Sequence, residues 1–297
     1  MKAAVIGVNG FLGQHLAHHL HQQGWEVHGY GRKAQALIPL RSYKVIDLTN
    51  TDDIKNIDTE VDFIFYFSGV TGTYKAYDDY EKYIDVNEKG LLNILSLLRE
   101  RKSKSRIIFP STRLVYKGVE SIPLKEEDEK EFKTIYALTK WFGEQVLQHY
   151  ATYFNIPYTI YRICVPYGNI FNSQYSYGTI GFFLSNARAG KNITLYGDGS
   201  LKRTFTYVTE ISSQIFQSVV KQDSVNKIYN ITGETFSLKE VALAIAKKYE
   251  VELEYKKWPE NDKLIESGDT IFDGSKIQQL INYKTRYTFS KWLQDLI

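Results

Sequence analysis

The sequence has little cysteine and no long apolar stretch. Cys164 is the one cysteine among 297 residues, which excludes an internal disulfide and any metal site built on several cysteines. No apolar run approaches the roughly 20 residues that span a membrane. The opening MKAAVIGVNG is too poor in apolar residues to predict a signal peptide. We therefore expect a cytoplasmic protein without a membrane partner.

The charge of the chain is nearly balanced. A net charge of +3 at pH 7 is too small to require an acidic partner. The basic run RERKSKSR at 99–106 can be interpreted as a nucleic-acid patch or as the end of a helix. We favour the helix end, where cations meet the negative pole of the helix dipole. No nucleic-acid partner is expected.

Two common catalytic signatures are missing. The sequence has no HExxH motif of a metalloprotease and no GxSxG elbow of a serine hydrolase. Four histidines, His15, His18, His19 and His21, crowd one expected helix. Because a metal would need further ligands, we interpret them as a polar helix face and predict no metal site.

The first half alternates apolar runs with amphipathic ones. Such a pattern indicates parallel strands buried on both faces and separated by helices. It predicts a doubly wound α/β domain, a Rossmann sheet, over residues 1–165. The expected strands are 2–8, 25–31, 43–48, 61–69, 106–112 and 158–165, and the expected helices are 11–24, 83–102 and 134–154.

The second half is less regular. Residues 166–297 predict a smaller α/β lobe that binds substrate, with some segments returning to the first domain. A strand at 226–232 and a helix beginning after Ser237 belong to this lobe. The acidic stretch KEEDEKE at 125–131 is most simply a solvated loop.

A glycine-rich turn, GVNGFLG, joins the first strand to the first helix. Gly7, Gly10 and Gly13 are three residues apart, with Phe11 and Leu12 between the last two. A turn without side chains lets backbone amides and a helix N-terminus approach a pyrophosphate. This context predicts that the turn, including Phe11 and Leu12, binds a dinucleotide coenzyme.

Tyr136 and Lys140 lie four residues apart in IYALTK, within an expected helix. By itself the pair is as consistent with an ordinary helix face as with chemistry. Residues one turn apart face the same way, and an ammonium beside a phenol favours the phenolate. That is the tuning a tyrosine needs to transfer protons near neutral pH.

These motifs together resemble the extended short-chain dehydrogenase/reductases that modify nucleotide sugars. GxxGxxG, Tyr-x-x-x-Lys and the upstream segment STRLVYK occur in the family's order, and the resemblance covers nearly the whole chain. It implies that Thr112, Tyr136 and Lys140 are catalytic. It also implies that Tyr136 and Lys140 contact the coenzyme, and that Thr112 and Tyr136 contact the substrate.

The coenzyme preference is predicted from YGRK, which lies at the end of the second strand. This segment offers Arg32 and Lys33 without a carboxylate, and Glu26 stands at the wrong end of that strand. Two cations suit a 2′-phosphate, which favours NADP(H), with NAD(H) still possible. The two cations could also simply open a surface loop. The resemblance implies four further coenzyme contacts: Asp47, Leu48, Ser68 and Gly69.

The reaction is predicted from the coenzyme, since the resemblance implies that members consuming NADPH are typically 4-keto reductases, and from the two residues directly after Thr112. Arg113 and Leu114 stand where related dehydratases carry Asp-Glu, which argues against dehydration. Our leading hypothesis is an NADPH-dependent reductase of a nucleotide-linked 4-keto sugar. The alternatives are a nucleotide-sugar 4-epimerase that uses the same residues, and a non-catalytic coenzyme-sensing protein.

Substrate contacts are also implied by the resemblance. Arg203 matches an arginine that holds substrate phosphates, and Tyr196 stacks on the nucleobase or belongs to the core. The chain departs from the family pattern at Val165, Lys117 and Thr204.

Two further expectations concern a loop and the assembly. Tyr175 and Tyr177 lie in a segment that could close over the sugar. The resemblance implies a homodimer formed through the helices 83–102 and 134–154.

Overall fold

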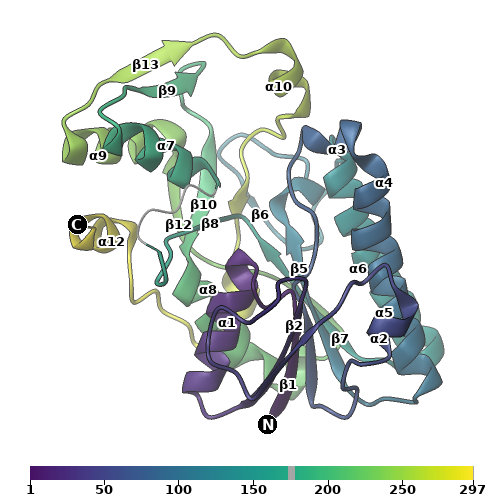
Figure 1. The fold of residues 1–297 in the computed structure, drawn as a ribbon. Coiled ribbons are helices and arrows are strands. Elements are labelled where there is room, and N and C mark those ends of the chain that lie inside the picture. The colour runs from purple at the N-terminus through teal and green to yellow at the C-terminus, as the bar shows by residue number, and fades with distance from the viewer. Residues whose placement is uncertain (173–177, 297) are drawn as a thin grey trace. The chain divides into compact units, whose positions relative to one another are not determined.

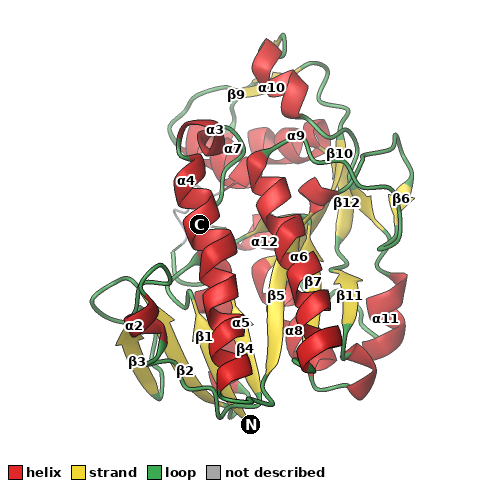
Figure 2. Ribbon diagram, turned by 90° about the vertical axis from the view of Figure 1, so that its right-hand side faces the viewer, coloured by secondary structure: helices red, strands yellow, loops and turns green. Residues whose placement is uncertain are grey.

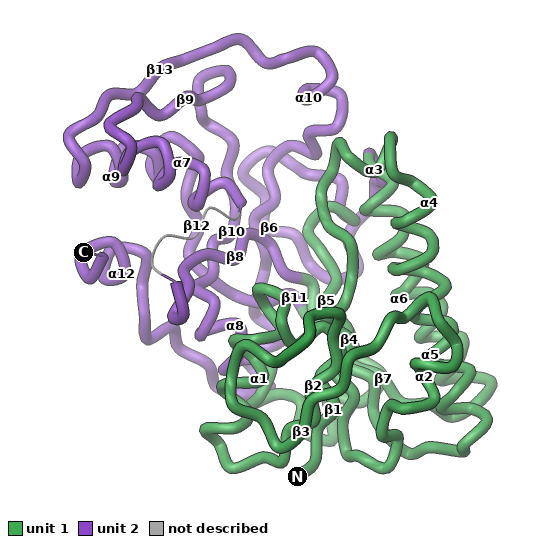
Figure 3. The backbone as a smooth tube through the Cα atoms, viewed as in Figure 1, with its two compact units in different colours: residues 1–115, 134–162, 215–229 green, residues 116–133, 163–214, 230–297 purple. Residues whose placement is uncertain are grey.

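The computed structural model describes residues 1–172 and 178–296 (Figure 1). The chain forms two compact units (Figure 3): unit 1 is Met1–Val115, Thr134–Arg162 and Ile215–Tyr229, and unit 2 is Tyr116–Lys133, Ile163–Gln214 and Asn230–Ile297. The chain was expected to divide after residue 165, with some later segments returning to the first domain. Residues 116–133 join unit 2 because their strand pairs with 271–272, and residues 215–229 return to unit 1.

Unit 1 is built on a seven-stranded sheet in the order β3-β2-β1-β4-β5-β7-β11. The pairs β2–β3, β1–β2, β1–β4 and β4–β5 are parallel, as predicted. The seventh strand was predicted in the smaller lobe, but it extends this sheet beside β7. The strands are β1 Lys2–Ile6, β2 Glu26–Gly31, β3 Ser42–Val45, β4 Phe63–Tyr66, β5 Arg106–Thr112, β7 Tyr158–Ile163 and β11 Lys227–Asn230.

Helices cover both faces of this sheet. Figure 2 shows α5 and α6 crossing one face, and Figure 1 shows α1 on the other. The expected helix 83–102 contains a π-helical segment, η1, between α4 and α5. The helical elements are α1 Phe11–Gln22, α2 Thr51–Ile54, α3 Lys75–Asp78, α4 Tyr80–Tyr83, η1 Ile84–Lys89, α5 Gly90–Glu100, η2 Arg113–Val115, α6 Ile135–Phe154, η3 Gln222–Ser224 and, shared with unit 2, α8 Val208–Val219.

The core of unit 1 explains why these elements form. All four residues of β4 are buried, since a central parallel strand has no solvent-facing side. On α5, Ile94, Leu95 and Leu98 recur at helical spacing and are fully buried. They join Ile64 and Ile107 of the sheet in one apolar cluster.

Of the four histidines on α1, only His21 is exposed, so the four do not form one polar face as we predicted. His15 is 1% exposed, and its Nδ1 lies 2.6 Å from the carbonyl oxygen of Phe11. Burial lowers the pKa of His19, whose ring meets Phe216 edge to face at 5.3 Å. His15 and His19 therefore serve as packing groups, and Phe216 of α8 lies against the His19 ring.

The basic run is the end of a helix, as predicted. Helix α5 ends at Glu100, and the guanidinium of Arg101 donates to the carbonyl oxygens of Lys55 and Ile57 at 2.7 and 2.9 Å. The Arg106 guanidinium donates to the carbonyl of Val219 at 2.9 Å. These arginines stabilise loops of unit 1.

Unit 2 contains a three-stranded sheet in the order β12-β10-β8 and two pairs, β13–β9 and β14–β6. Its strands are β6 Pro123–Leu124, β8 Val165–Tyr167, β9 Ile193–Tyr196, β10 Lys202–Tyr207, β12 Glu234–Ser237, β13 Leu253–Lys256 and β14 Ile271–Phe272. Its helices are α7 Gly178–Arg188, α9 Leu238–Tyr249, α10 Glu260–Ile265, α11 Ser275–Ile281 and α12 Phe289–Asp295. Ser237 caps α9 by accepting from the backbone N–H of Glu240, as expected.

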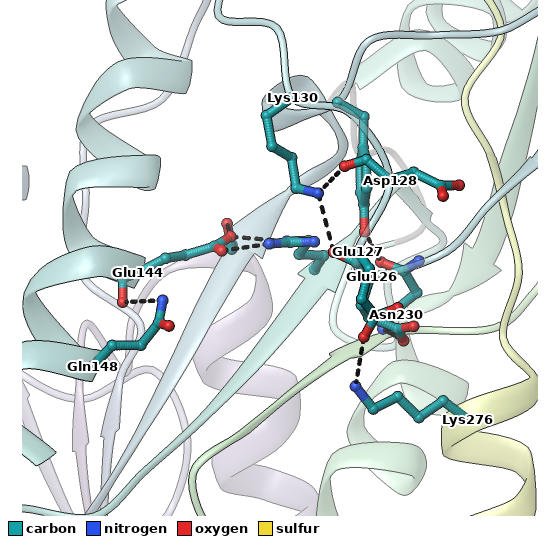
Figure 4. A network of polar contacts seen from close by, with 11 residues as sticks. Glu126, Glu127, Asp128, Lys130, Glu144, Gln148, Asn230 and Lys276 are labelled. Carbon is teal, nitrogen blue, oxygen red and sulfur yellow. Dashed lines mark hydrogen bonds and ion pairs between the residues drawn. The ribbon is translucent and has the colours of Figure 1, made fainter. Parts of the chain in front are cut away.

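The acidic stretch 125–131 is only partly the solvated loop that we predicted. Glu126 is 7% exposed, and its carboxylate accepts the backbone N–H of Asn230 at 2.7 Å (Figure 4). Burial raises the pKa of this carboxyl. Lys130 donates to the carbonyl oxygens of Glu126 and Asp128, which closes the loop on itself.

Candidate active site and coenzyme site

The glycine turn has the close backbone approach that a pyrophosphate site requires. Gly7 adopts φ +86°, and a Cβ there would lie 2.6 Å from the backbone nitrogen of Ser68. A Cβ on Gly13 would lie 2.3 Å from the carbonyl oxygen of Gly7. Gly10 caps α1 without a side chain, so the amides of the first turn remain uncovered. A side chain at Gly7 or Gly13 would force this turn open.

A cavity of about 250 Å³ lies beside this turn in unit 1. Its lining includes Ile6, the last residue of β1, and Phe67, directly after β4, and the sheet order reverses between these two strands. Ligands of doubly wound folds bind at such a switch point. The lining residues are Ile6, Gly7, Asn9, Gly10, Gly31, Arg32, Lys33, Ile46, Asp47, Leu48, Phe67, Ser68, Gly69, Val70 and Val86.

The cavity brings together most of the predicted coenzyme residues. Eight line it: Gly7, Gly10, Arg32, Lys33, Asp47, Leu48, Ser68 and Gly69. Phe11, Leu12 and Gly13, in the first turn of α1, are not among its lining residues, nor are Tyr136 and Lys140 on α6.

Asn9 is a lining residue that we did not predict from the sequence. Its amide donates to the carbonyl of Gln35 at 3.0 Å, and its carbonyl oxygen accepts the N–H of Leu37 at 2.9 Å. The side chain therefore holds the loop that carries Arg32 and Lys33 against the glycine turn. An asparagine between two turn glycines was the available signal.

Both signs of charge reach the cavity. Arg32 and Lys33 follow β2 and are exposed, while Glu26 begins that strand, away from the cavity, and lies 2.9 Å from His28. Asp47 supplies a carboxylate from beyond β3. Its pKa is lowered by the backbone N–H and hydroxyl of Thr49, and to a smaller extent by the Arg32 charge. The cavity wall can therefore meet either a phosphate or a hydroxyl.

A buried asparagine connects the cavity to helix α6. Asn87, in the π-helical η1, accepts the N–H of Val70 at 2.7 Å and donates to its carbonyl at 3.0 Å. The same amide donates to the Thr139 hydroxyl at 3.1 Å, and that hydroxyl donates to the carbonyl of Tyr136 at 3.0 Å. A π-turn is typical of functional sites, and no sequence pattern predicted this one.

The predicted catalytic residues stand on two neighbouring elements of unit 1. Thr112 ends β5 at 7% exposure, and its hydroxyl oxygen accepts the N–H of Leu114 at 3.3 Å. Thr134 caps α6 by accepting the N–H of Ala137, which starts the helix just before Tyr136. Tyr136 is half-buried in this first turn. The helix packs on β5, the strand that ends at Thr112.

Lys140 is buried one turn after Tyr136. Its ammonium lies 3.9 Å from the centre of the Phe109 ring, which can approach because Gly143 has no Cβ. Burial lowers the pKa of Lys140 from 10.5 to about 7, and the Glu144 carboxylate opposes this shift. The pKa of the Lys140 amine therefore lies close to neutral pH.

One turn after Lys140, Glu144 of α6 forms a buried ion pair that the sequence did not reveal (Figure 4). Glu144 is 0% exposed and Arg162 is 1% exposed. The Arg162 guanidinium donates to both carboxylate oxygens at 3.0 and 2.6 Å, and the Ser111 hydroxyl donates to one of them. Three consecutive turns of one helix face thus carry Tyr136, Lys140 and Glu144.

In unit 2, Arg203 is not poised toward solvent. It is 2% exposed, and its guanidinium donates to the carbonyls of Lys202 and Gly268 and to Glu266 Oε1 at 2.5 Å. Tyr196 is 40% exposed, so a core role for it was wrong. Its ring lies 5.4 Å from that of Trp258. Tyr175 and Tyr177 lie outside the described residues.

The residues of unit 1 fit a dinucleotide. The turn excludes side chains at Gly7 and Gly13, an uncovered helix N-terminus lies next to it, and cations and a carboxylate line the remainder of the cavity. Within 1–172 and 178–296, no group of three or more histidine, cysteine or acidic residues could hold a metal ion. None of the described helices is long and apolar enough to span a membrane.

Comparison with known families agrees with this geometry. A model described as "NAD dependent epimerase/dehydratase family" matches residues 3–232. The chain belongs to the NAD-dependent epimerase/dehydratase family. The resemblance inferred from the motifs is therefore confirmed, and so is the Rossmann-type fold.

Relatives within this epimerase/dehydratase family are enzymes. UDP-N-acetyl-alpha-D-glucosaminuronate decarboxylase from Bacillus cytotoxicus is 28% identical over 259 residues, 81% of this chain and 78% of the relative. CDP-paratose 2-epimerase from Salmonella typhi is 23% identical over 335 residues, 100% of this chain and 98% of the relative. The crystal structure of a UDP-glucuronic acid 4-epimerase from Bacillus cereus, in complex with UDP-glucuronic acid and NAD, has a TM-score of 0.86. The two sequences are 22% identical, and the match covers 100% of this chain and 98% of the Bacillus cereus chain. This likeness shows the fold.

Proposed function

We propose that this family member is an NADPH-dependent reductase of a nucleotide-linked 4-keto sugar. The observation that carries the proposal is the face of α6, where half-buried Tyr136 precedes buried Lys140 by one turn. The coenzyme cavity in the same unit supports it, because Asn87 links that cavity to the carbonyl of Tyr136 through Thr139.

The side chains have separate roles in this reaction. Bound NADPH supplies the hydride that reduces the sugar carbonyl. The Thr112 hydroxyl orients the carbonyl oxygen, and the Tyr136 phenol gives its proton to that oxygen as negative charge develops. Lys140 holds the nicotinamide ribose and favours the resulting phenolate by its charge. Because the pKa of Lys140 is about 7, its proton can return to Tyr136 without a strong base.

NADPH is favoured over NADH by the two cations of the cavity. Arg32 and Lys33 stand where a 2′-phosphate would need them, and no carboxylate follows β2 directly. Asp47 lines the same cavity and suits a 2′-hydroxyl, so it is the residue that would permit NADH. A coenzyme titration tests the preference: tighter binding of NADPH supports it, and equal or tighter binding of NADH contradicts it.

A 4-epimerase is the second candidate, and the relatives favour it. Several carry the word epimerase in their names, and the Bacillus cereus structure contains NAD. An epimerase would use Thr112, Tyr136 and Lys140 with the coenzyme regenerated in place. Absence of Asp-Glu after Thr112 argues against a dehydratase in either case.

The nucleotide sugar is proposed to be bound by unit 2, through Tyr196 at the base and Arg203 at the phosphates. Exposure of Tyr196 beside Trp258 supports the first contact. We also propose a homodimer through α5 and α6, because Leu138 and Phe154 of α6 are 48% and 43% exposed. Native mass spectrometry that shows only monomer would contradict the dimer.

One experiment tests the function as a whole. The protein is purified, any bound ligand is released, and the coenzyme and nucleotide sugar are identified by mass. Purified protein is then supplied with NADPH and nucleotide-4-keto sugars carrying UDP, dTDP, CDP or GDP. Net oxidation of one coenzyme per product supports a reductase. Turnover without net oxidation identifies an epimerase, and coenzyme binding without turnover of any sugar identifies a sensor.

A further inference from the structure

The arginine expected to hold the substrate's phosphates is already paired within the chain. Arg203 and Glu266 form an ion pair with a 2.5 Å N–O distance, in which the arginine side chain is 3% exposed and the glutamate side chain 20%. A planar guanidinium pairs with a carboxylate and with a phosphate through the same donors. A substrate phosphate that reached Arg203 would therefore meet an internal anion first.

The two partners are held very differently. The Arg203 guanidinium also donates to the carbonyls of Lys202 and Gly268, and the backbone of its strand bridges to Thr270. The segment after Glu266 is fixed as well, since the carbonyl of Ser267 accepts the N–H of Gly118 at 2.9 Å. The arginine is thus part of a rigid framework.

Glu266 is less firmly held than Arg203, and its side chain is 20% exposed. It follows α10, a short helix without a single buried residue. Its carboxylate can rotate toward solvent without disturbing any of the hydrogen bonds that fix Arg203 to the carbonyls. Displacement therefore requires a side-chain rotation and leaves the strand unchanged.

Lys133 contacts the backbone of Glu266. The Lys133 ammonium donates to the backbone carbonyl of Glu266 at 2.9 Å and lies 3.3 Å from the Glu131 carboxylate. If the Glu266 carboxylate rotates away, Arg203 stays in place, because the carbonyls of Lys202 and Gly268 hold its guanidinium. A phosphate group can then accept from the guanidinium donors that the carboxylate occupied.

We propose that the Glu266 carboxylate is a built-in competitor that occupies Arg203 until a substrate phosphate displaces it. This inference rests on the proposed nucleotide-sugar function and assigns to Glu266 the control of phosphate affinity. Because a ligand must displace the Glu266 carboxylate, ligands with one weak anionic group bind Arg203 poorly. A nucleoside diphosphate carries more negative charge and displaces the carboxylate.

The test is a set of calorimetric titrations on the full chain with UDP, CDP, GDP and dTDP, and with the matching phosphate-free nucleosides. Glu266→Gln keeps the shape of the side chain and removes its charge. We expect it to bind the preferred diphosphate about fivefold more tightly than the wild type, the size expected when one partly exposed ion pair stops competing. Binding of the nucleoside should not change. Glu260→Gln, an exposed position on α10, is the matched control and should equal the wild type.

A double-mutant cycle identifies the partner. In an Arg203→Gln background, Glu266→Gln should have no effect on diphosphate affinity, because the shared arginine is gone. Unchanged or weaker binding by the single Glu266→Gln variant overturns the proposal while leaving the nucleotide-sugar function intact. If no nucleotide binds either protein although coenzyme does, the proposal and the substrate class both fall.

Discussion

Replacing Lys140 with methionine should stabilise the coenzyme-free protein while it abolishes turnover. The lysine is 7% exposed, and burial lowers its pKa from 10.5 to about 7. Each pKa unit corresponds to about 1.4 kcal/mol, so the buried charge costs on the order of 5 kcal/mol near pH 7. Hydrophobic replacement of buried ionic groups recovers about 1–4 kcal/mol. We therefore expect a gain of about 3 kcal/mol in the free energy of unfolding.

The pH dependence of that gain is set by proton linkage. Between the two pKa values the unfolded lysine is protonated and the folded one is neutral, so the unfolded state binds more protons. Wild-type stability therefore rises with pH in this window, from about 7 to 10.5. The advantage of Lys140→Met should shrink by about 2 kcal/mol between pH 7 and 9.

Urea titrations followed by tryptophan fluorescence at pH 7 and 9 measure both effects. The matched control is Lys104→Met, which removes an exposed lysine of the same unit and should change stability little at either pH. A Lys140→Met protein that is less stable than the wild type would refute the reasoning. A gain that is the same at both pH values would also refute it.

Three further substitutions test the coenzyme and catalytic sites. Tyr136→Phe should lower turnover roughly 10³-fold in an NADPH oxidation assay and leave the coenzyme dissociation constant unchanged, because only the proton donor is lost. Gly7→Ala places a Cβ 2.6 Å from a backbone nitrogen and should lower both the melting temperature and the affinity for coenzyme. Gly24→Ala is the control: Gly24 has a similar φ but nothing within 4 Å of an added Cβ, so this variant should lower the melting temperature through backbone strain alone. Glu144→Gln leaves the buried Arg162 charge uncompensated and should cost about 3–5 kcal/mol in chemical denaturation; a cost below about 1 kcal/mol would contradict a dry ion pair.

Local patterns in the sequence predicted the parts of the molecule that local physics determines. All six strands expected for the first domain are present. The central ones could be predicted because parallel strands inside a sheet are apolar on both faces. The glycine turn could be predicted because a close backbone approach excludes side chains. Tyr136 and Lys140 share a face because the helical repeat dictates it. Their resemblance to a known family supplied the chemistry.

Contacts between residues distant in the sequence could not be predicted. Glu144 pairs with Arg162 on another element, and Glu266 pairs with Arg203, which is 63 residues away. The sequence around each of these two glutamates looks like that of a glutamate exposed to solvent. The His19 ring meets Phe216 of α8, and β11 joins the main sheet only because the chain returns to unit 1. Tertiary packing decides each of these cases.

Isotope transfer tests the central claim most directly. NADPH deuterated at the transferable position is mixed with the protein and the 4-keto nucleotide sugar, and the product is analysed by mass spectrometry. The account predicts one deuterium on the reduced carbon for each coenzyme oxidised, and loss of this transfer in Tyr136→Phe. Product that forms without deuterium, or a phenylalanine variant that transfers it at the wild-type rate, would contradict the account.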